Sequence, residues 1–445
     1  MNRPTLRESV YSLFRYNAFA FCVRLATGIV MARVLGPDQM GVWLLLSLIP
    51  TYAEGFGRLK ADAAAIYVLP QGRWNLGEVS LAVNVIAALS SLPLVIGLLV
   101  FETQVMGLLF GELILDPLWY RLTVLLIPLQ FHSLAYSYLI LHFENVPAYN
   151  IQAALRVLLP AVVSALLLLS TPLRLGALVV SLLIGTALSV VYGMVVVHRH
   201  ARPQFASQPG LYGALLSFGR RLYAAGAIEQ LNQYLASLLV GLHLAPRQLA
   251  FFRLGQDRVQ LLDQVTTSVT TLLFPRIARE TDAEAQVDIL AKSCRVLCLL
   301  LALGGILGAL LAPAVIWALY GREFLPMTWS VWLFMPGVVA LGATSPVTQY
   351  LMGCGKPEMI WKLALVPLLL QFCLLVPAIT HWGFRGAALV VSLSFVSLAT
   401  ARLLALRAMT GRRASALLVP GAAEFRIVRS FIAERLRRIP FLKRA

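Results

Sequence analysis

The chain has 445 residues, of which 59% are hydrophobic and only 13% are charged, and its mean hydropathy is +0.79. Soluble domains are about 45–50% apolar and about 25% charged, so this composition excludes a soluble globular protein and requires lipid around the chain. The net charge of +17 would favour nucleic-acid binding in a soluble protein. Here its meaning depends on where the basic residues lie relative to the membrane, and we expect no nucleic-acid partner.

Apolar segments long enough to cross a bilayer, which takes roughly 20 residues of helix, recur along the whole chain. They predict an all-α polytopic membrane protein with about twelve transmembrane helices: Ser12–Ala32, Met40–Gly57, Glu78–Val100, Trp119–Ile140, Tyr149–Leu169, Gly176–Val197, Gly213–Leu242, Gln248–Leu273, Cys294–Leu319, Trp329–Met352, Met359–Thr380 and Gly386–Leu406. Lys and Arg concentrate in cytoplasmic loops, and they do so here if both termini are cytoplasmic. The outer loops are then all short.

An internal repeat divides the chain in two. Leu35-Gly36-Pro37-Asp38-Gln39-Met40 resembles Leu244-Ala245-Pro246-Arg247-Gln248-Leu249, which lies 209 residues later, and Leu126-Ile127-Pro128 resembles Phe334-Met335-Pro336, 208 residues later. An even number of spans separates the copies, so we expect two parallel repeats related by an axis along the membrane normal.

The domain boundaries follow from this repeat and from the longest polar break. We expect a six-helix lobe at residues 1–200, a cytoplasmic linker at 201–210, a second six-helix lobe at 211–408 and a basic amphipathic cytoplasmic tail at 409–445. In the tail, apolar residues recur at three- and four-residue spacing among arginines, as in helices that lie on an anionic leaflet. A solvated tail is the alternative.

Three arginines lie well inside predicted spans. Arg24 is roughly 12 Å from the outer end of the first span, Arg258 roughly 15 Å from the outer start of the eighth, and Arg156 roughly 10 Å from the inner end of the fifth. Charges at such depth normally face a protein interior or a wet cavity. Because Arg presents forked donors that match phosphate oxygens, Arg24 and Arg258 predict binding of a phosphate or pyrophosphate, to which Arg156 contributes.

Acidic residues at depth are fewer. Glu54 and Asp263 are separated by 209 residues, so the repeat places them equivalently, and Glu229 and Asp257 are the other candidates. These four residues could couple transport to Na⁺ or H⁺. The alternative for Glu54 is an ion pair with Arg58, one turn further on. Apart from a coupling ion we expect no cofactor.

Sequence signatures of enzymes are absent. The chain has no Gly-rich phosphate loop, no HExxH motif and no carboxylate cluster on a large outer loop, and its histidines and cysteines are not spaced as metal ligands. We therefore expect no catalytic residues and no metal site, and a transporter in place of an enzyme.

Four stretches resemble the bacterial polysaccharide flippases of the Wzx-like group, in the multidrug/oligosaccharidyl-lipid/polysaccharide exporter superfamily. Ala32-Arg33-Val34-Leu35-Gly36-Pro37-Asp38-Gln39-Met40-Gly41-Val42-Trp43 is similar to the ArxLGPxxxG signature that follows the first span in that group. Further similarities are Leu273-Phe274-Pro275-Arg276-Ile277-Ala278, Leu319-Tyr320-Gly321-Arg322-Glu323-Phe324 and Gly353-Cys354-Gly355-Lys356-Pro357. The resemblance as a whole covers residues 1 to about 410.

The resemblance implies two six-helix lobes around a central cavity that opens alternately to each side of the bacterial inner membrane. It implies that the substrate is an oligosaccharide linked through pyrophosphate to undecaprenol, destined for surface lipopolysaccharide or exopolysaccharide. In the related lipid II flippases, arginines of the first and eighth spans engage the pyrophosphate, and Arg24 and Arg258 stand on those spans. Those relatives have fourteen spans, and many family members carry an acid in the middle of span seven, where this chain has Asn232-Gln233-Tyr234.

Three other functions remain open at this point. One is a cation-coupled drug exporter of the same fold. Another is a membrane polysaccharide polymerase or ligase, which the short outer loops disfavour, and the third is a scaffold in a synthesis complex. A flippase would work beside a polysaccharide polymerase and glycosyltransferases.

Overall fold

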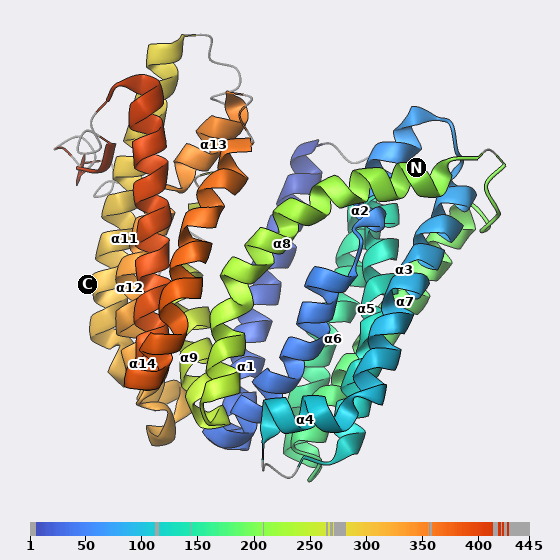
Figure 1. The fold of residues 1–445 in the computed structure, drawn as a ribbon, viewed down its shortest axis with the longest axis horizontal. Coiled ribbons are helices and arrows are strands. Elements are labelled where there is room, and N and C mark those ends of the chain that lie inside the picture. The colour runs from blue at the N-terminus through green and yellow to red at the C-terminus, as the bar shows by residue number, and fades with distance from the viewer. Residues whose placement is uncertain are drawn as a thin grey trace, which may run out of the picture. The chain divides into compact units, whose positions relative to one another are not determined.

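A computed structural model of the chain describes residues 6–111, 115–143, 145–207, 209–263, 266–267, 270, 282–354, 356, 358–412, 417–419, 421 and 425–426. Within these residues the secondary structure is helical and contains no β-strand (Figure 1). The chain forms two compact units. Unit 1 comprises Met1–Gln230 and Ala245–Arg247, and unit 2 comprises Leu231–Leu244 and Gln248–Ala445. The predicted all-α class is confirmed.

Unit 1 is built from helices that run up and down beside one another (Figure 1). They are α1 (Leu6–Tyr52), the π-helical turn η1 (Ala53–Gly57), α2 (Ala61–Val68), the 3₁₀ turn η2 (Leu69–Gln71), α3 (Leu76–Val100), α4 (Glu102–Phe110), α5 (Pro117–His142), α6 (Val146–Ser170), α7 (Leu175–His200) and most of α8 (Leu211–His243). The short helix α4 occupies a segment that the sequence predicted as an outer loop.

Unit 2 contains the end of α8 and the helices that follow it. These are α9 (Pro246–Val259), the 3₁₀ turn η3 (Gln260–Leu262), α11 (Ala283–Tyr320), the 3₁₀ turn η4 (Arg322–Phe324), α12 (Met327–Ala343), α13 (Ser345–Gly353) and α14 (Glu358–Thr410). The tenth predicted span is divided between α12 and α13. Most of the predicted tail and the end of the eighth predicted span lie outside the described residues.

Eight described helical segments are long and apolar enough to cross a membrane. Two of them, α1 and α14, each contain two predicted spans joined at a glycine: Gly36 has φ 72° and Gly383 has φ 60°. Glycine enters this left-handed region at no steric penalty, so each residue turns the chain between two spans. With α8 and α9, which are not among the eight, the structure confirms the predicted twelve crossings.

The turn at Gly36 and the corner between α8 and α9 lie together in unit 1. A Cβ atom on Gly41 would lie 1.9 Å from the carbonyl oxygen of Pro246, so the two backbones are in direct contact. Nη1 of Arg247 lies 3.6 Å from Oδ2 of Asp38. The two charged residues occupy equivalent positions of the sequence repeat. The second glycine of the ArxLGPxxxG signature is thus explained by close backbone approach.

Gly41→Ala is expected to destabilise the protein, because the added methyl group meets backbone that cannot rotate away. Overpacking of this kind costs about 1–3 kcal/mol. Gly97→Ala on α3 is the matched control, since nothing lies within 4 Å of the added atom and alanine is favoured over glycine in a helix by about 0.5–1 kcal/mol. Thermal unfolding in detergent should show a lower Tm for Gly41→Ala and an unchanged or higher Tm for Gly97→Ala. Equal Tm values would contradict the close contact.

The segment predicted as a linker, 201–210, packs on the start of α3. Glu78 is 2% exposed; its Oε1 accepts the backbone N–H of Ser207 at 2.6 Å, and its Oε2 accepts that of Asn75 at 2.8 Å. The carbonyl of Gly77 accepts the N–H of Gln204 at 3.3 Å. The segment is therefore a fixed part of unit 1, and the change from unit 1 to unit 2 falls within α8, after Gln230.

Glu78→Gln is expected to loosen this segment, because a neutral amide has one acceptor oxygen in place of the two that receive N–H groups. Chymotrypsin should then cleave after Phe205, which is 84% exposed, several-fold faster than in the wild-type protein in detergent. Glu102→Gln, which removes an acid paired with Arg121 elsewhere in unit 1, should leave the cleavage rate unchanged. Equal rates in both variants would show that Glu78 does not hold the segment.

Candidate functional site

Two predicted spans are not among the eight: α8 is long enough but too polar, and the described part of α9 has only 14 residues. In α9, Arg253, Asp257 and Arg258 fall within fourteen residues. A charge in a membrane-spanning helix costs at least ~2.5–3.5 kcal/mol on insertion scales unless protein or water receives it. Their partners within unit 2 therefore indicate what this helix does.

Arg253 is held between α9 and the end of α8. Its Nε lies 3.5 Å from Oδ1 of Asp257, and its Nη1 donates to Oγ of Ser237 at 3.4 Å. Its Cζ lies 4.9 Å from the ring centroid of Tyr234, close enough for a cation–π contact. Arg253 is thus a second basic residue of the site, and the sequence prediction did not include it.

Arg258 extends toward the end of α11. Its Cζ lies 5.7 Å from the ring centroid of Tyr320, the last residue of that helix. Helical side chains lean toward the start of their own helix, so Arg258 and Tyr320, on helices that run in opposite directions, approach each other. The guanidinium is therefore displaced from its own backbone, toward the end of unit 2 at which α9 begins. The predicted depth of residue 258 does not include this displacement.

Two buried polar atoms at this contact have no hydrogen-bond partner among the described residues. They are Nε of Arg258 and the hydroxyl oxygen of Tyr320. A buried donor or acceptor without a partner is unfavourable by about 1–3 kcal/mol. The Nε–H of Arg258 thus lacks an acceptor among the described residues, and the hydroxyl group of Tyr320 shares this property.

The four acids predicted for ion coupling are spread over both units. Asp257 pairs with Arg253. Asp263, at the end of η3, interacts electrostatically with Arg402 of α14. Glu229 is an exposed residue of α8. Among the described residues, no three His, Cys, Asp or Glu side chains come together as a metal-ion site. Ion coupling at these acids stays a prediction.

The two arginines predicted in unit 1 have different surroundings. Arg24 is exposed, and its Nε donates to the carbonyl of Ala20 at 3.3 Å, one turn back along α1. Arg156 on α6 is half-buried, and its Nη1 is buried without a partner among the described residues. One turn before it, Gln152 donates to the carbonyl of Ser133 at 3.1 Å. Arg156 therefore adjoins the buried polar contacts of α5 and α6.

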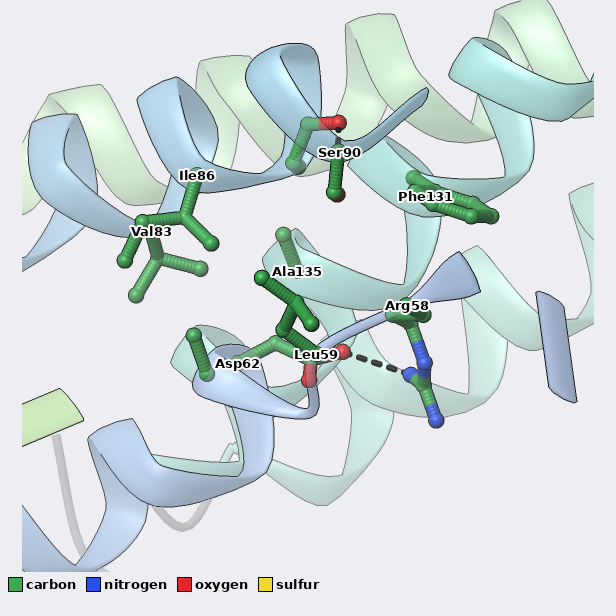
Figure 2. A pocket seen from close by; sticks show the side chains of 10 residues that line it. Arg58, Leu59, Asp62, Val83, Ile86, Ser90, Phe131 and Ala135 are labelled. Carbon is green, nitrogen blue, oxygen red and sulfur yellow. Dashed lines mark hydrogen bonds and ion pairs between the residues drawn. The ribbon is translucent and has the colours of Figure 1, made fainter. Parts of the chain in front are cut away.

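Arg58, which the sequence offered as an ion-pair partner for Glu54, pairs with a different acid in the structure. Arg58 pairs with Asp62, with Nη1 2.5 Å from Oδ2, and the two side chains are 12% and 4% exposed. Figure 2 shows this pair at a small cavity, otherwise lined mainly by apolar side chains of α3 and α5, including Val83 and Phe131. Glu54 lies in the π-helical turn just before it.

Sequence reasoning missed three charged side chains for identifiable reasons. Arg253 lies near the start of its predicted span and was therefore not counted as deep. Arg58 and Asp62 follow the predicted end of the second span at Gly57, and were assigned to a loop. Their i, i+4 spacing was no signal, because the spacing rule holds within a helix and the helix is broken between them at Lys60, which has φ 52°.

Comparisons with known proteins agree with this architecture. The family model described as polysaccharide biosynthesis protein matches residues 121–329, a little under half of the chain. No curated protein matches the sequence. A multidrug resistance MATE family transporter of the MOP superfamily in its inward-facing conformation is similar, with a TM-score of 0.67 at 14% identity, covering 89% of this chain and 95% of that chain.

Two further solved structures share the fold. The lipid II flippase MurJ, in an inward closed conformation, has a TM-score of 0.67 at 13% identity, with 88% of this chain and 86% of that chain covered. The chain has the fold of a MOP-superfamily transporter. A MOP-superfamily transporter from Pyrococcus furiosus is also similar, with a TM-score of 0.59 at 11% identity over 93% of this chain and 97% of that chain.

These matches confirm the resemblance found in the sequence. The chain is a multi-pass membrane protein, its residues 121–329 are similar to a family of polysaccharide biosynthesis proteins, and the solved structures that share its fold are transporters and a flippase. At identities of 11–14% the structural likeness establishes the fold. The substrate has to be argued from the residues of this chain.

Proposed function

We propose that the protein is a flippase that moves undecaprenyl-pyrophosphate-linked oligosaccharide across the bacterial inner membrane by alternating access, for surface polysaccharide synthesis. The observation that carries the proposal is the basic character of α9, in a chain that matches a polysaccharide biosynthesis family. Arg258 has an N–H group without a partner among the described residues, and Arg253 lies one and a half turns away. Forked guanidinium donors suit pyrophosphate oxygens.

The charge of the site favours an anionic cargo. Arg24 and Arg258 are the proposed pyrophosphate ligands, with Arg156 as an additional one. A cationic drug would be bound by carboxylates, but Asp257, the acid that precedes Arg258 in α9, is already paired with Arg253. The proposed drug exporter therefore has less support than the flippase.

We place both termini in the cytoplasm, in keeping with the basic residues of the loops, and we expect Na⁺ or H⁺ to drive the cycle. Only differential binding of cargo or ion to the two conformations can shift the equilibrium between them. Glu54, Asp263, Glu229 and Asp257 are the candidate coupling residues. A polysaccharide polymerase and glycosyltransferases are the expected working partners.

Deletion of the gene tests the proposal. The mutant should lose surface polysaccharide and accumulate lipid-linked repeat units on the cytoplasmic face, and the full chain supplied in trans should restore both. Accumulation of repeat units that are translocated but unpolymerised would instead indicate a polymerase or ligase. Intact polysaccharide with loss of drug resistance would indicate a drug exporter.

A further inference from the structure

In the ion pair between Arg253 and Asp257, the carboxylate occupies the position in which an anionic ligand could contact the guanidinium. Their side chains lie one turn apart on α9, with 3.5 Å between Nε and Oδ1, and are 16% and 37% exposed. Ser237 and Tyr234 on α8 contact the guanidinium from other directions. The protein therefore fixes the arginine, while the carboxylate is the more accessible partner.

The pair is loose for a contact between opposite charges. Arginine–carboxylate contacts are usually about 2.7–2.9 Å long and frequently bidentate, whereas this pair makes one contact of 3.5 Å. A phosphate group offers several oxygens to the planar guanidinium and can form two parallel hydrogen bonds. Asp257 thus covers Arg253 with a weaker contact than a phosphate would make.

We propose that Asp257 is a resident competitor, which the phosphate of the cargo displaces from Arg253. The inference rests on the proposed function, because it takes the cargo to be a pyrophosphate-linked lipid. In the empty protein, Asp257 compensates one of the two arginines that lie within the predicted eighth span on α9, Arg253 and Arg258, and so lowers the penalty for holding both in the membrane. In the loaded protein, its charge opposes that of the phosphate, weakens binding and favours release. Asp257 is a positioning residue that tunes affinity.

Pyrophosphate binding to the purified full-length chain tests the inference. The titration is done by calorimetry at low salt, where charge effects are least screened. The Kd for Asp257→Asn should be about tenfold lower than for the wild-type protein, a change within the usual range for coupling between sites. Asp257→Ser, a second neutral variant, should also bind more tightly. The matched control is Asp38→Asn, since Asp38 lies 3.6 Å from Arg247 but is 71% exposed. Its Kd should be unchanged.

A double mutant separates competition from a general charge effect. Arg253→Gln should raise the Kd, and in that background Asp257→Asn should bring little further gain, because two residues that act through one contact are not additive. If Arg258→Gln weakens binding but neither Asp257 variant tightens it, the inference is wrong and the proposed function stands. If the wild-type chain does not bind pyrophosphate, both are wrong.

Discussion

Arg258→Ala is expected to abolish surface polysaccharide while leaving the protein in the membrane. The guanidinium has a buried N–H without a partner among the described residues and can therefore donate to a pyrophosphate. Hydrogen bonds to charged groups contribute about 1.5–3 kcal/mol each, and every 1.4 kcal/mol is tenfold in affinity. Loss of two such bonds would weaken headgroup binding by at least a hundredfold. Complementation of a deletion strain, with surface polysaccharide and membrane-bound protein both measured, checks this result.

Matched variants test whether the loss of surface polysaccharide is specific to the proposed pyrophosphate ligands. Arg322→Ala removes an exposed arginine of η4 outside the spans and should support wild-type polysaccharide. Arg258→Lys should restore part of the activity, because lysine keeps the charge but loses the forked donors. Arg24→Ala should behave as Arg258→Ala does. Wild-type polysaccharide with Arg258→Ala and Arg24→Ala would refute the assignment of pyrophosphate to these residues.

The course of the chain through the membrane was predictable because lipid imposes a minimum apolar length on every crossing. The span predicted at Gly176–Val197 is found as α7, Leu175–His200, and the one predicted at Glu78–Val100 is found as α3, Leu76–Val100. The helix α4 was missed because nine residues are too few for this signal. Hydropathy reports how long a segment is buried in lipid, and it contains no information on short helices at the surface.

The candidate site was only partly predictable, because the position of a residue along a helix does not give the position of its charge. Arg24 and Arg258 were predicted at similar depths. In the structure, each long side chain leans toward the start of its own helix: Arg24 contacts Ala20 of α1, and Arg258 contacts Tyr320 at the end of α11. The contact of Arg258 and the partners of Arg253 depend on which helices are neighbours, which a single sequence does not specify.

The pair formed by Arg58 and Asp62 could not be predicted from span lengths, because it follows a π-helical turn and a break in the helix. Lys60, between them, has φ 52°, a left-handed conformation that is unfavourable for a residue with a side chain. This break lets α2 begin at Ala61 and places Asp62, in its first turn, inside unit 1. Buried ion pairs are often no more stable than apolar replacements, but one partner left alone is strongly unfavourable.

Arg58→Met is therefore expected to destabilise the protein by about 3–5 kcal/mol, since it leaves the carboxylate of Asp62 buried without its counter-charge. The double variant Arg58→Met/Asp62→Leu should recover most of the lost stability, because neither charge then remains in the apolar cavity of Figure 2. The control is Glu102→Gln, which breaks a pair with Arg121 and leaves an arginine that is 59% exposed, so water can solvate the charge that remains. Thermal unfolding in detergent should rank Arg58→Met far below the wild-type protein, with the double variant and Glu102→Gln close to it. A Tm for Arg58→Met equal to that of Glu102→Gln would mean that water reaches Asp62, and the cavity would then be a hydrated part of unit 1.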